Sequence, residues 1–265
     1  MKSFIDQVGR TLQIPGTPRK IISLVPSVTE LLCDLGLDTQ VIGITSYCVH
    51  PPQWQNSKTK VGGTKKLDLE KILALGPDLV LANKEENRKE QVESLMQSVP
   101  VWVSEVCNVP QALDLVDRIG EITSRQKEAG SLHARIASGF VNPLQPSGGN
   151  AVYLIWRKPW MTVGGDTFIS DMMRHLGISN AFGSATRYPK VSLEEISGVQ
   201  PEWVLLSSEP FPFGEKHRAE LGSALPGSRI ILVDGEMFSW YGSRMVHAAT
   251  YFRRLREIMG LEGRS

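Results

Sequence analysis

The chain has 265 residues, a length that suits two lobes of roughly 100 residues each. Its 29 Lys and Arg balance 28 Asp and Glu to a formal net charge of +1, which excludes a global field that attracts nucleic acids or anionic membranes. The three cysteines Cys33, Cys48 and Cys107 are odd in number and widely spaced, which argues against a disulfide framework and a zinc-ribbon pattern.

Strands and helices alternate in the first part of the chain. Strands are predicted at 21–24, 41–44, 78–82 and 101–103, and helices at 69–75 and 87–97. A further helix is predicted to begin at Ser27 as N-cap, with Glu30 completing a capping box, and to end at Gly36. Asp68 is the predicted cap of the helix at 69–75. This alternation predicts a parallel sheet covered by helices on both faces.

The pattern changes between Pro110 and Phe140. Apolar residues keep helical spacing there without an interrupting strand or proline, which predicts one long helix. Gly120 and Gly130 each cost about 1 kcal/mol against Ala in a helix interior, so a break near either stays open. The stretch 142–150 has the composition of a linker.

A second α/β pattern follows the linker. Strands are predicted at 151–156, 203–207 and 229–233, and helices at 167–176, 193–198 and 243–259. We therefore predict two Rossmann-like lobes with parallel sheets. Their expected bounds are 1–108 for the N-terminal lobe, 109–140 for the connecting helix and 141–265 for the C-terminal lobe.

One segment occurs twice. Residues 67–82, LDLEKILALGPDLVLA, return at 191–206 as VSLEEISGVQPEWVLL, identical at six of sixteen positions. Each copy reads as a short capped helix that leads into a parallel strand. The duplication predicts two similar lobes, and a small molecule is commonly held in a cleft between lobes.

The usual catalytic and phosphate-binding motifs are absent from the sequence. It contains no GxGxxG after a strand, no GxxxxGK[ST], no HExxH and no GxSxG. We therefore expect no catalytic residues and no required cofactor. In 163–166, VGGD, the amides of Gly164 and Gly165 are candidates to approach an anion, although a tight turn before the next helix is the favoured interpretation.

The strongest group of candidate ligand-binding residues lies in a strand-end loop, Tyr47-Cys48-Val49-His50-Pro51-Pro52. Ligands of α/β sheets gather at the carboxyl ends of the strands. Cys48 and His50 project to the same side of an extended segment, which makes them candidate ligands of a soft metal or of a metallated ligand. The alternative, a buried cysteine beside a hydrogen-bonded histidine, is the favoured one.

Other predicted strand ends supply aromatic and charged partners. The aromatic rings are suited to stack on a flat ligand, and the arginines to pair with its carboxylates or phosphates, although packing of loop against lobe is an equal alternative for each ring. These candidates are Lys84, Glu86, Trp156, Arg157, Trp160, Glu236, Trp240, Tyr241 and Arg244.

Over residues 19–257 the chain resembles the helical-backbone class of ABC-importer substrate-binding proteins, which includes cobalamin, siderophore, haem and metal receptors. The segments RKIISLVPSVTELLCDLG, VIGITSYCVHPPQ, LDLEKILALGPDLVLA, the 110–138 helix and VSLEEISGVQPEWVLL carry the resemblance. The cobalamin carriers are the most similar, through the SY-x-x-x-PP stretch at 46–52. The resemblance implies a non-enzymatic, monomeric carrier with a ligand between two lobes.

The resemblance also assigns Glu70 and Glu194 to docking on the arginines of a permease. From the residues alone, each glutamate needs no partner, because a carboxylate is favoured in the first turn of a helix. His50 replaces a tyrosine of the cobalamin carriers, and Thr64 and Asn83 align near their tryptophans. These polar replacements favour a metal chelate or a metallated tetrapyrrole as the ligand.

The N-terminus carries no apolar core of a signal peptide. As written, we expect the chain to be cytoplasmic, or periplasmic or surface-anchored if a leader has been removed. The alternative function is a cytosolic enzyme or metal-handling accessory that uses Cys48 and His50, with Cys48 as thiolate ligand or nucleophile.

Overall fold

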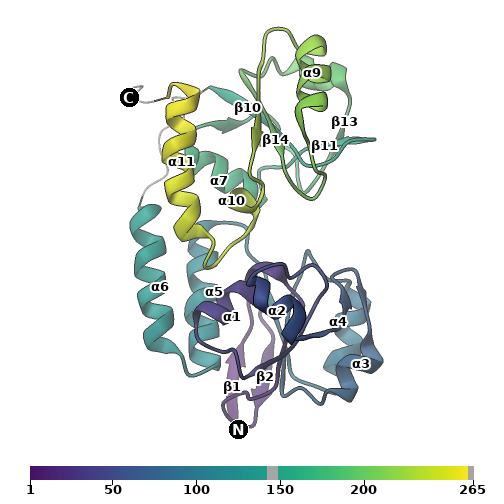
Figure 1. Cartoon of the computed structure of the whole chain (residues 1–265), viewed down its shortest axis with the longest axis vertical. Helices are drawn as coiled ribbons and strands as arrows, with labels where there is room; N and C mark the ends of the chain where they lie inside the picture. Colours follow the sequence, from purple (N-terminus) through teal and green to yellow (C-terminus); the bar gives the residue numbers. More distant parts are fainter. Residues whose placement is uncertain (142–148, 262–265) are drawn as a thin grey trace. The chain divides into compact units, whose positions relative to one another are not determined.

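The computed structural model describes residues 1–141 and 149–261 (Figure 1). They form two compact units that interleave along the chain. Unit 1 holds Met1–Val106, Pro110–Ala137 and Tyr241–Arg244, and unit 2 holds Cys107–Val109, Ser138–Trp240 and Met245–Ser265. The predicted linker lies mostly in 142–148, outside the described residues. No helix in the described part of the chain is both long enough and apolar enough to cross a membrane.

Unit 1 contains a parallel sheet in the order β5-β4-β3-β8-β9. Its strands are β3 (Ile21–Ser23), β4 (Val41–Ile44), β5 (Thr59–Lys60), β8 (Leu79–Asn83) and β9 (Val101–Ser104), and its helices are α1 (Pro26–Asp34), α2 (Pro52–Ser57), α3 (Leu69–Ala74) and α4 (Lys89–Met96). A short antiparallel pair, β6 (Gly62–Gly63) and β7 (Lys66–Leu67), precedes α3. Ile22, Val80 and Ile72 are fully buried where strands and helices pack.

Unit 2 contains a second parallel sheet in the order β12-β10-β14-β15. Its strands are β10 (Asn150–Leu154), β12 (Ser179–Asn180), β14 (Trp203–Ser207) and β15 (Arg229–Val233), and its helices are α7 (Phe168–Leu176), α8 (Leu193–Gly198), α9 (Glu215–Ala224), α10 (Glu236–Ser239) and α11 (Met245–Met259). Outside this sheet, β11 (Trp160–Met161) pairs antiparallel with β13 (Lys190–Val191).

The two sheets share one topology. Four strands have the same order in both sheets, β4-β3-β8-β9 in unit 1 and β12-β10-β14-β15 in unit 2, and unit 1 adds the short edge strand β5. The chain therefore switches direction between β3 and β8 in unit 1 and between β10 and β14 in unit 2. The repeated segment occupies the same place in both, as α3 with β8 and as α8 with β14. Ligands of open α/β sheets bind outside the carboxyl ends of the strands at such a switch point.

The prediction of one long helix at 110–140 is wrong. The structure has two helices, α5 (Val109–Ile122) and α6 (Gln126–Gly139), which lie side by side (Figure 1) with Nδ1 of His133 2.9 Å from Asp117 Oδ2. The chain reverses through Ser124, whose φ of 58° is left-handed, and the amide of Arg125 donates to the Gly120 carbonyl at 2.7 Å. Both helices keep an apolar face, so the spacing of apolar residues does not reveal the reversal.

The predicted capping box of α1 is also wrong. The N-cap is Val25, which makes no side-chain cap, and Pro26 occupies the first turn. The Glu30 carboxylate pairs with Arg244 and does not reach back to the helix start. Proline is favoured in a first turn because its missing amide proton has no helical acceptor there.

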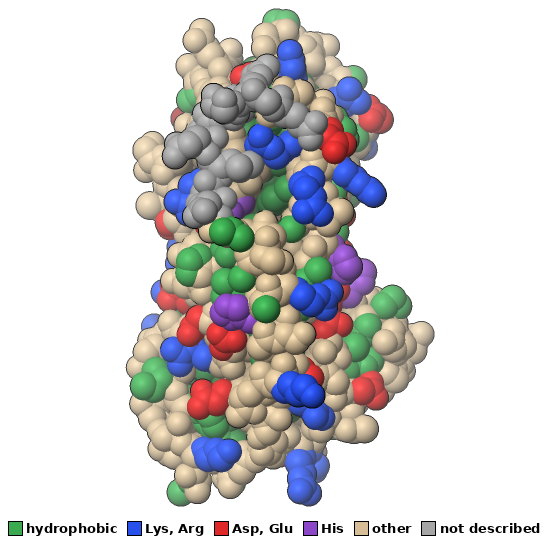
Figure 2. All heavy atoms as spheres, turned by 90° about the vertical axis from the view of Figure 1, so that its left-hand side faces the viewer, with side chains coloured by type: hydrophobic (Ala, Val, Ile, Leu, Met, Phe, Trp, Pro, Cys, Tyr) green, Lys and Arg blue, Asp and Glu red, His purple; other side chains and the backbone are tan. Residues whose placement is uncertain are grey.

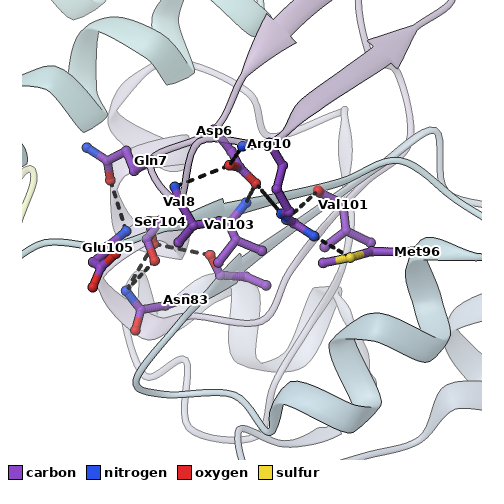
Figure 3. A network of polar contacts seen from close by, with 11 residues as sticks. Asp6, Gln7, Val8, Arg10, Asn83, Met96, Val101, Val103, Ser104 and Glu105 are labelled. Atoms are coloured by element: carbon purple, nitrogen blue, oxygen red, sulfur yellow. Dashed lines mark hydrogen bonds and ion pairs between the residues drawn. The ribbon is translucent and has the colours of Figure 1, made fainter.

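An N-terminal hairpin, not predicted from the sequence, covers the edge of the unit 1 sheet. It consists of β1 (Lys2–Ile5) and β2 (Thr11–Ile14), and the turn between them reaches β9 (Figure 3). The buried Asp6 carboxylate accepts from the amides of Val8, Arg10 and Val103, and Gln7 donates its amide to the Val103 carbonyl at 3.2 Å. The hairpin thereby covers backbone groups of an edge strand.

Candidate ligand-binding site

An aromatic cluster lies at the switch point of unit 2. It consists of Trp156, Trp160, Phe211, Phe213 and His217, and its loops follow β10 and β14. The ring centroids of Trp156 and Phe211 are 5.7 Å apart, and those of Phe211 and Phe213 are 4.8 Å apart. Trp160 stacks on Phe213 at 6.1 Å. The Trp156 side chain is 40% exposed, so the cluster presents an accessible aromatic surface.

Backbone pairing holds these rings in place. The amide of Phe211 donates to the Ile155 carbonyl at 3.3 Å, which ties the loop after β14 to the end of β10. The pairing of β11 with β13 positions Trp160. At the start of α9, the His217 Nδ1 accepts from the Gly214 amide at 3.0 Å, and burial lowers the pKa of His217, which favours the neutral ring.

Arg157 is engaged within its own unit. Its guanidinium donates to Glu220 Oε1 at 2.8 Å and lies 5.6 Å from the centre of the Trp160 ring. The hydrogen bond from Arg157 lowers the pKa of Glu220, so this carboxylate is ionised at neutral pH. The Arg157 guanidinium therefore already has a carboxylate partner.

Trp240 is held against a buried carboxylate. Its indole Nε1 donates to Glu209 Oε1 at 2.9 Å, the Ser239 hydroxyl donates to the same oxygen at 2.6 Å, and Trp240 is only 7% exposed. Burial raises the pKa of Glu209, and the nearby charges of Glu236 and Asp234 add to that rise. Trp240 therefore packs the loop against its unit, and this burial does not favour stacking of its ring on a ligand.

In unit 1 the loop after β4 separates an exposed ring from a buried thiol. Tyr47 is 64% exposed. Cys48 is fully buried, and its sulfur lies 3.0 Å from the Thr29 hydroxyl and 3.2 Å from that of Thr45. Burial raises the pKa of the Cys48 thiol, which disfavours a thiolate. The geometry thus favours a buried core cysteine over a metal ligand at Cys48. Metal binding by Cys48 and His50 stays a prediction.

The other unit 1 candidates pair with one another or with neighbouring acids. The Tyr241 hydroxyl donates to Glu86 Oε1 at 3.3 Å, and burial, followed by the charge of Glu86, holds the pKa of Tyr241 well above its usual range. Lys84 forms an ion pair with Glu105. Arg244 donates two hydrogen bonds to Glu30, at 3.0 Å and 2.6 Å, and burial raises the pKa of Glu30 against the lowering effect of Arg244.

The predicted residues therefore fall into two groups, each within one unit. Unit 1 holds Tyr47, Cys48, His50, Lys84, Glu86, Tyr241 and Arg244, and unit 2 holds Trp156, Arg157, Trp160, Glu236 and Trp240. Sequence reasoning missed Phe211 and Phe213, although the segment 210–213, PFPF, directly after a predicted strand was a usable signal. It also missed Glu30 and Glu220, because nothing local in the sequence announces an ion pair between distant residues.

Two further sequence hypotheses are answered by geometry. The amides of Gly164 and Gly165 donate to the carbonyls of Arg187 and Ala185, at 2.7 Å and 3.0 Å, which leaves neither for an anion. Within residues 1–141 and 149–261, no group of three or more His, Cys, Asp or Glu side chains is arranged to hold a metal ion.

The repeated glutamates lie at equivalent positions. Glu70 and Glu194 are exposed in the first turns of α3 and α8. Asp68 caps α3 through the Lys71 amide, as predicted, and Ser192 with Glu195 forms a capping box on α8. Hydrogen bonds from its own backbone amide and from Ser192 lower the pKa of Glu194, so its carboxylate is ionised and accessible.

Two parallel sheets of one topology, with aromatic loops at a switch point, define the class of two-lobe binding proteins. The chain belongs to the periplasmic binding protein family, whose model matches residues 21–221. It is a substrate-binding protein and not an enzyme, as predicted from the resemblance. The alternative of an enzyme built on Cys48 and His50 is not supported.

Known relatives cover most of the chain. A vitamin B12-binding protein of Vibrio campbellii is 30% identical over 200 residues, which are 73% of this chain and 72% of that protein. An uncharacterised ABC transporter substrate-binding lipoprotein of Bacillus subtilis is 24% identical over 257 residues, 91% of this chain and 81% of that one. The crystal structure of the periplasmic vitamin B12-binding protein of Vibrio cholerae has a TM-score of 0.78 at 22% identity and covers 93% of this chain and 99% of its own.

Proposed function

We propose that the protein binds a metal-containing macrocycle, with a corrinoid as the first candidate, and presents it to an ABC permease. The observation that carries this proposal is the aromatic cluster at the switch point of unit 2, where Trp156 lies exposed beside Phe211. Flat apolar ligands stack on such rings, and ligand sites are mostly apolar with a few polar groups. The 30% identity to a vitamin B12-binding protein supports the corrinoid over other macrocycles.

Tyr47 is the proposed counterpart in unit 1, because it is the exposed aromatic ring of a strand-end loop. His50, in the same loop, is a proposed polar or metal-directed contact. Haem, a siderophore or another metal chelate remains the broader ligand class. Glu70 and Glu194 are the proposed permease contacts, since both are exposed at equivalent points of the two units.

A location outside the cytoplasmic membrane fits this function. The names of two relatives support it, since one is a periplasmic protein and the other a lipoprotein. The balanced surface also fits a small-molecule carrier. On the face drawn in Figure 2, the coloured Lys and Arg side chains are interspersed with Asp and Glu, as expected for a protein whose partner is not a polyanion.

Ligand titration tests the proposal. Cyanocobalamin, haemin and a ferric hydroxamate are each added while tryptophan fluorescence and heat are measured. A true ligand at a hundredfold excess over its Kd stabilises the fold by about 2.7 kcal/mol. Trp156→Ala is expected to weaken binding by about tenfold or more, because an exposed ring at the centre of a site contributes about 1–2 kcal/mol.

Ile258→Ala provides the matched control. Ile258 is a 74% exposed apolar side chain on α11 of the same unit, so its truncation removes apolar surface without touching the aromatic cluster. The affinity of Ile258→Ala for the ligand should equal that of the wild type. The proposal fails if none of the three compounds stabilises the protein, or if both variants weaken binding equally.

A further inference from the structure

The structure also bears on the charge of the ligand, because three of the candidate cations, Arg157, Arg244 and Lys84, are already paired with carboxylates. In unit 2, Arg157 is held by Glu220 at 2.8 Å, and the two side chains are 24% and 39% exposed. In unit 1, Arg244 is held by Glu30 through two hydrogen bonds, with exposures of 12% and 15%. Lys84 is held by Glu105. Guanidinium groups are the usual clamps for carboxylates and phosphates, and here they are committed inside their own units.

Additional carboxylates follow the strands of unit 2. Glu209 comes after β14, and Asp234 and Glu236 come after β15. These three are close enough for Asp234 and Glu236 to raise the pKa of Glu209. Lys158 is an exposed ammonium whose charge acts on Glu220, as that of Arg157 does. An exposed lysine is strongly hydrated and contributes little to a fixed anion clamp.

Carboxylates also follow the strands of unit 1. Glu85 and Glu86 follow β8, Glu105 follows β9, and Glu30 lies on α1 beside Arg244. The Lys65 ammonium donates to the Glu85 backbone carbonyl. An anionic group that approaches Arg244 or Lys84 must separate an existing ion pair or lie beside carboxylates, and like charges at close range disfavour binding.

We infer that Glu220 and Glu30 are specificity-determining residues that mask Arg157 in unit 2 and Arg244 in unit 1, so that each unit by itself favours an uncharged or cationic, amide-bearing metal macrocycle over one that carries free carboxylates. The inference rests on the proposed function and narrows its ligand class. Carboxylate oxygens at the strand ends accept hydrogen bonds from amide N–H groups, whereas they repel propionate or catecholate groups. The charge of the ligand's peripheral groups, and not only the shape of the ligand, then determines which ligand the protein binds.

Two probes of opposite periphery test this inference. Cyanocobalamin has an amide periphery and no net charge, and haemin carries two propionates. The wild type is expected to bind cyanocobalamin more tightly, with an affinity that changes by less than about twofold between about 0.05 and 0.5 M NaCl, since no net charge is screened.

Glu220→Gln should release the Arg157 guanidinium and raise the affinity for haemin, relative to that for cyanocobalamin, by about tenfold, the gain of one charge-assisted pair. The gain for haemin should fall as NaCl is raised. Glu215→Gln is the matched control, because Glu215 lies on the same helix and its partner is Arg218 at 3.5 Å, so the same charge is removed without freeing Arg157.

The outcomes separate the two proposals. If neither compound binds, this inference is overturned, whereas the proposed function fails only if the ferric hydroxamate does not bind either. If haemin binds the wild type more tightly than cyanocobalamin, the protein is a carrier but the masking inference is overturned. The masking inference is also overturned if Glu220→Gln and Glu215→Gln change haemin affinity equally.

Discussion

Glu209 is a carboxylate whose ionisation is unfavourable in the folded unit. It lies beside Trp240 and Ser239, which both donate to Oε1, yet burial dominates and raises its pKa. A carboxyl group whose folded pKa is raised contributes stability below its unfolded pKa, and this contribution is lost as pH rises through the folded pKa. Its charged form is therefore a source of pH-dependent instability in the neutral range.

Glu209→Gln is expected to preserve both acceptor contacts and remove that charge. Its free energy of unfolding should equal or fall below that of the wild type at pH 4, where Glu209 is largely protonated, and should exceed it increasingly toward pH 7. Urea unfolding at several pH values measures the difference. Glu215→Gln, at an exposed position of α9, should show no such trend, and a pH-independent difference for Glu209→Gln would refute the explanation.

Charge pairs of this kind were outside the reach of sequence reasoning. Arg157 follows β10, as predicted, whereas Arg244 lies between α10 and α11 and belongs to unit 1. Their partners Glu220 and Glu30 are 63 and 214 residues away along the chain. Only the fold brings such residues together, so a sequence that shows an arginine at a strand end does not show whether its guanidinium already has a partner.

At the scale of elements, the turn between α5 and α6 depends on one glycine and not on another. A Cβ at Gly120 would lie 2.3 Å from the Ala129 Cβ and 3.2 Å from the Arg125 carbonyl oxygen. A Cβ at Gly130, in α6, would meet nothing within 4 Å. Gly120 is therefore required by the close approach of the two helices, and Gly130 is not.

Alanine at these two positions should have opposite effects. Gly120→Ala is expected to destabilise the fold by about 1–3 kcal/mol through overpacking, and Gly130→Ala to stabilise it by up to about 1 kcal/mol through helix propensity. Thermal and urea unfolding compare the stabilities of the two variants directly, and Gly130→Ala serves as the control for Gly120→Ala. Equal shifts of the same sign would show that the helices do not meet as described.

The elements that were predicted well carry local signals. Thr167 and Gly177 bound α7, Ser192 caps α8, and β14 is a continuous apolar run, so capping and composition sufficed. The hairpin of β1 and β2 was missed because its strands are short and mostly exposed. The break at Ser124 was missed because serine does not by itself indicate a left-handed φ, and the contact between α5 and α6, such as that of His133 with Asp117, is a tertiary one.

At the scale of the whole molecule, the duplicated segment was the most informative feature of the sequence. It predicted two similar lobes, and the structure has two parallel sheets that share the order of four strands. The same duplication places Glu70 and Glu194 at equivalent first turns, where both side chains are exposed. The proposed permease contact therefore has one acidic group on each unit.

Removal of both charges should therefore affect delivery and not ligand binding. Two exposed ion pairs contribute about 0.7 kcal/mol each, so Glu70→Gln with Glu194→Gln is expected to weaken docking on the permease by about tenfold, in a salt-dependent manner. Uptake of labelled ligand by proteoliposomes that contain the permease, measured against carrier concentration, gives the docking constant. Ligand affinity of the variant should equal that of the wild type.

Glu90→Gln is the matched control for the docking variant, because Glu90 is also an exposed glutamate in a helix first turn, on α4, but lies outside the duplicated segment. A general loss of negative charge would slow uptake in both proteins, whereas docking through the repeat would slow it only in the double variant. Additive effects of the single changes Glu70→Gln and Glu194→Gln are also expected, since the two sites lie in separate units. If the double variant supports the same uptake as the wild type at the same carrier concentration, the two glutamates do not dock on the permease and only stabilise their helices.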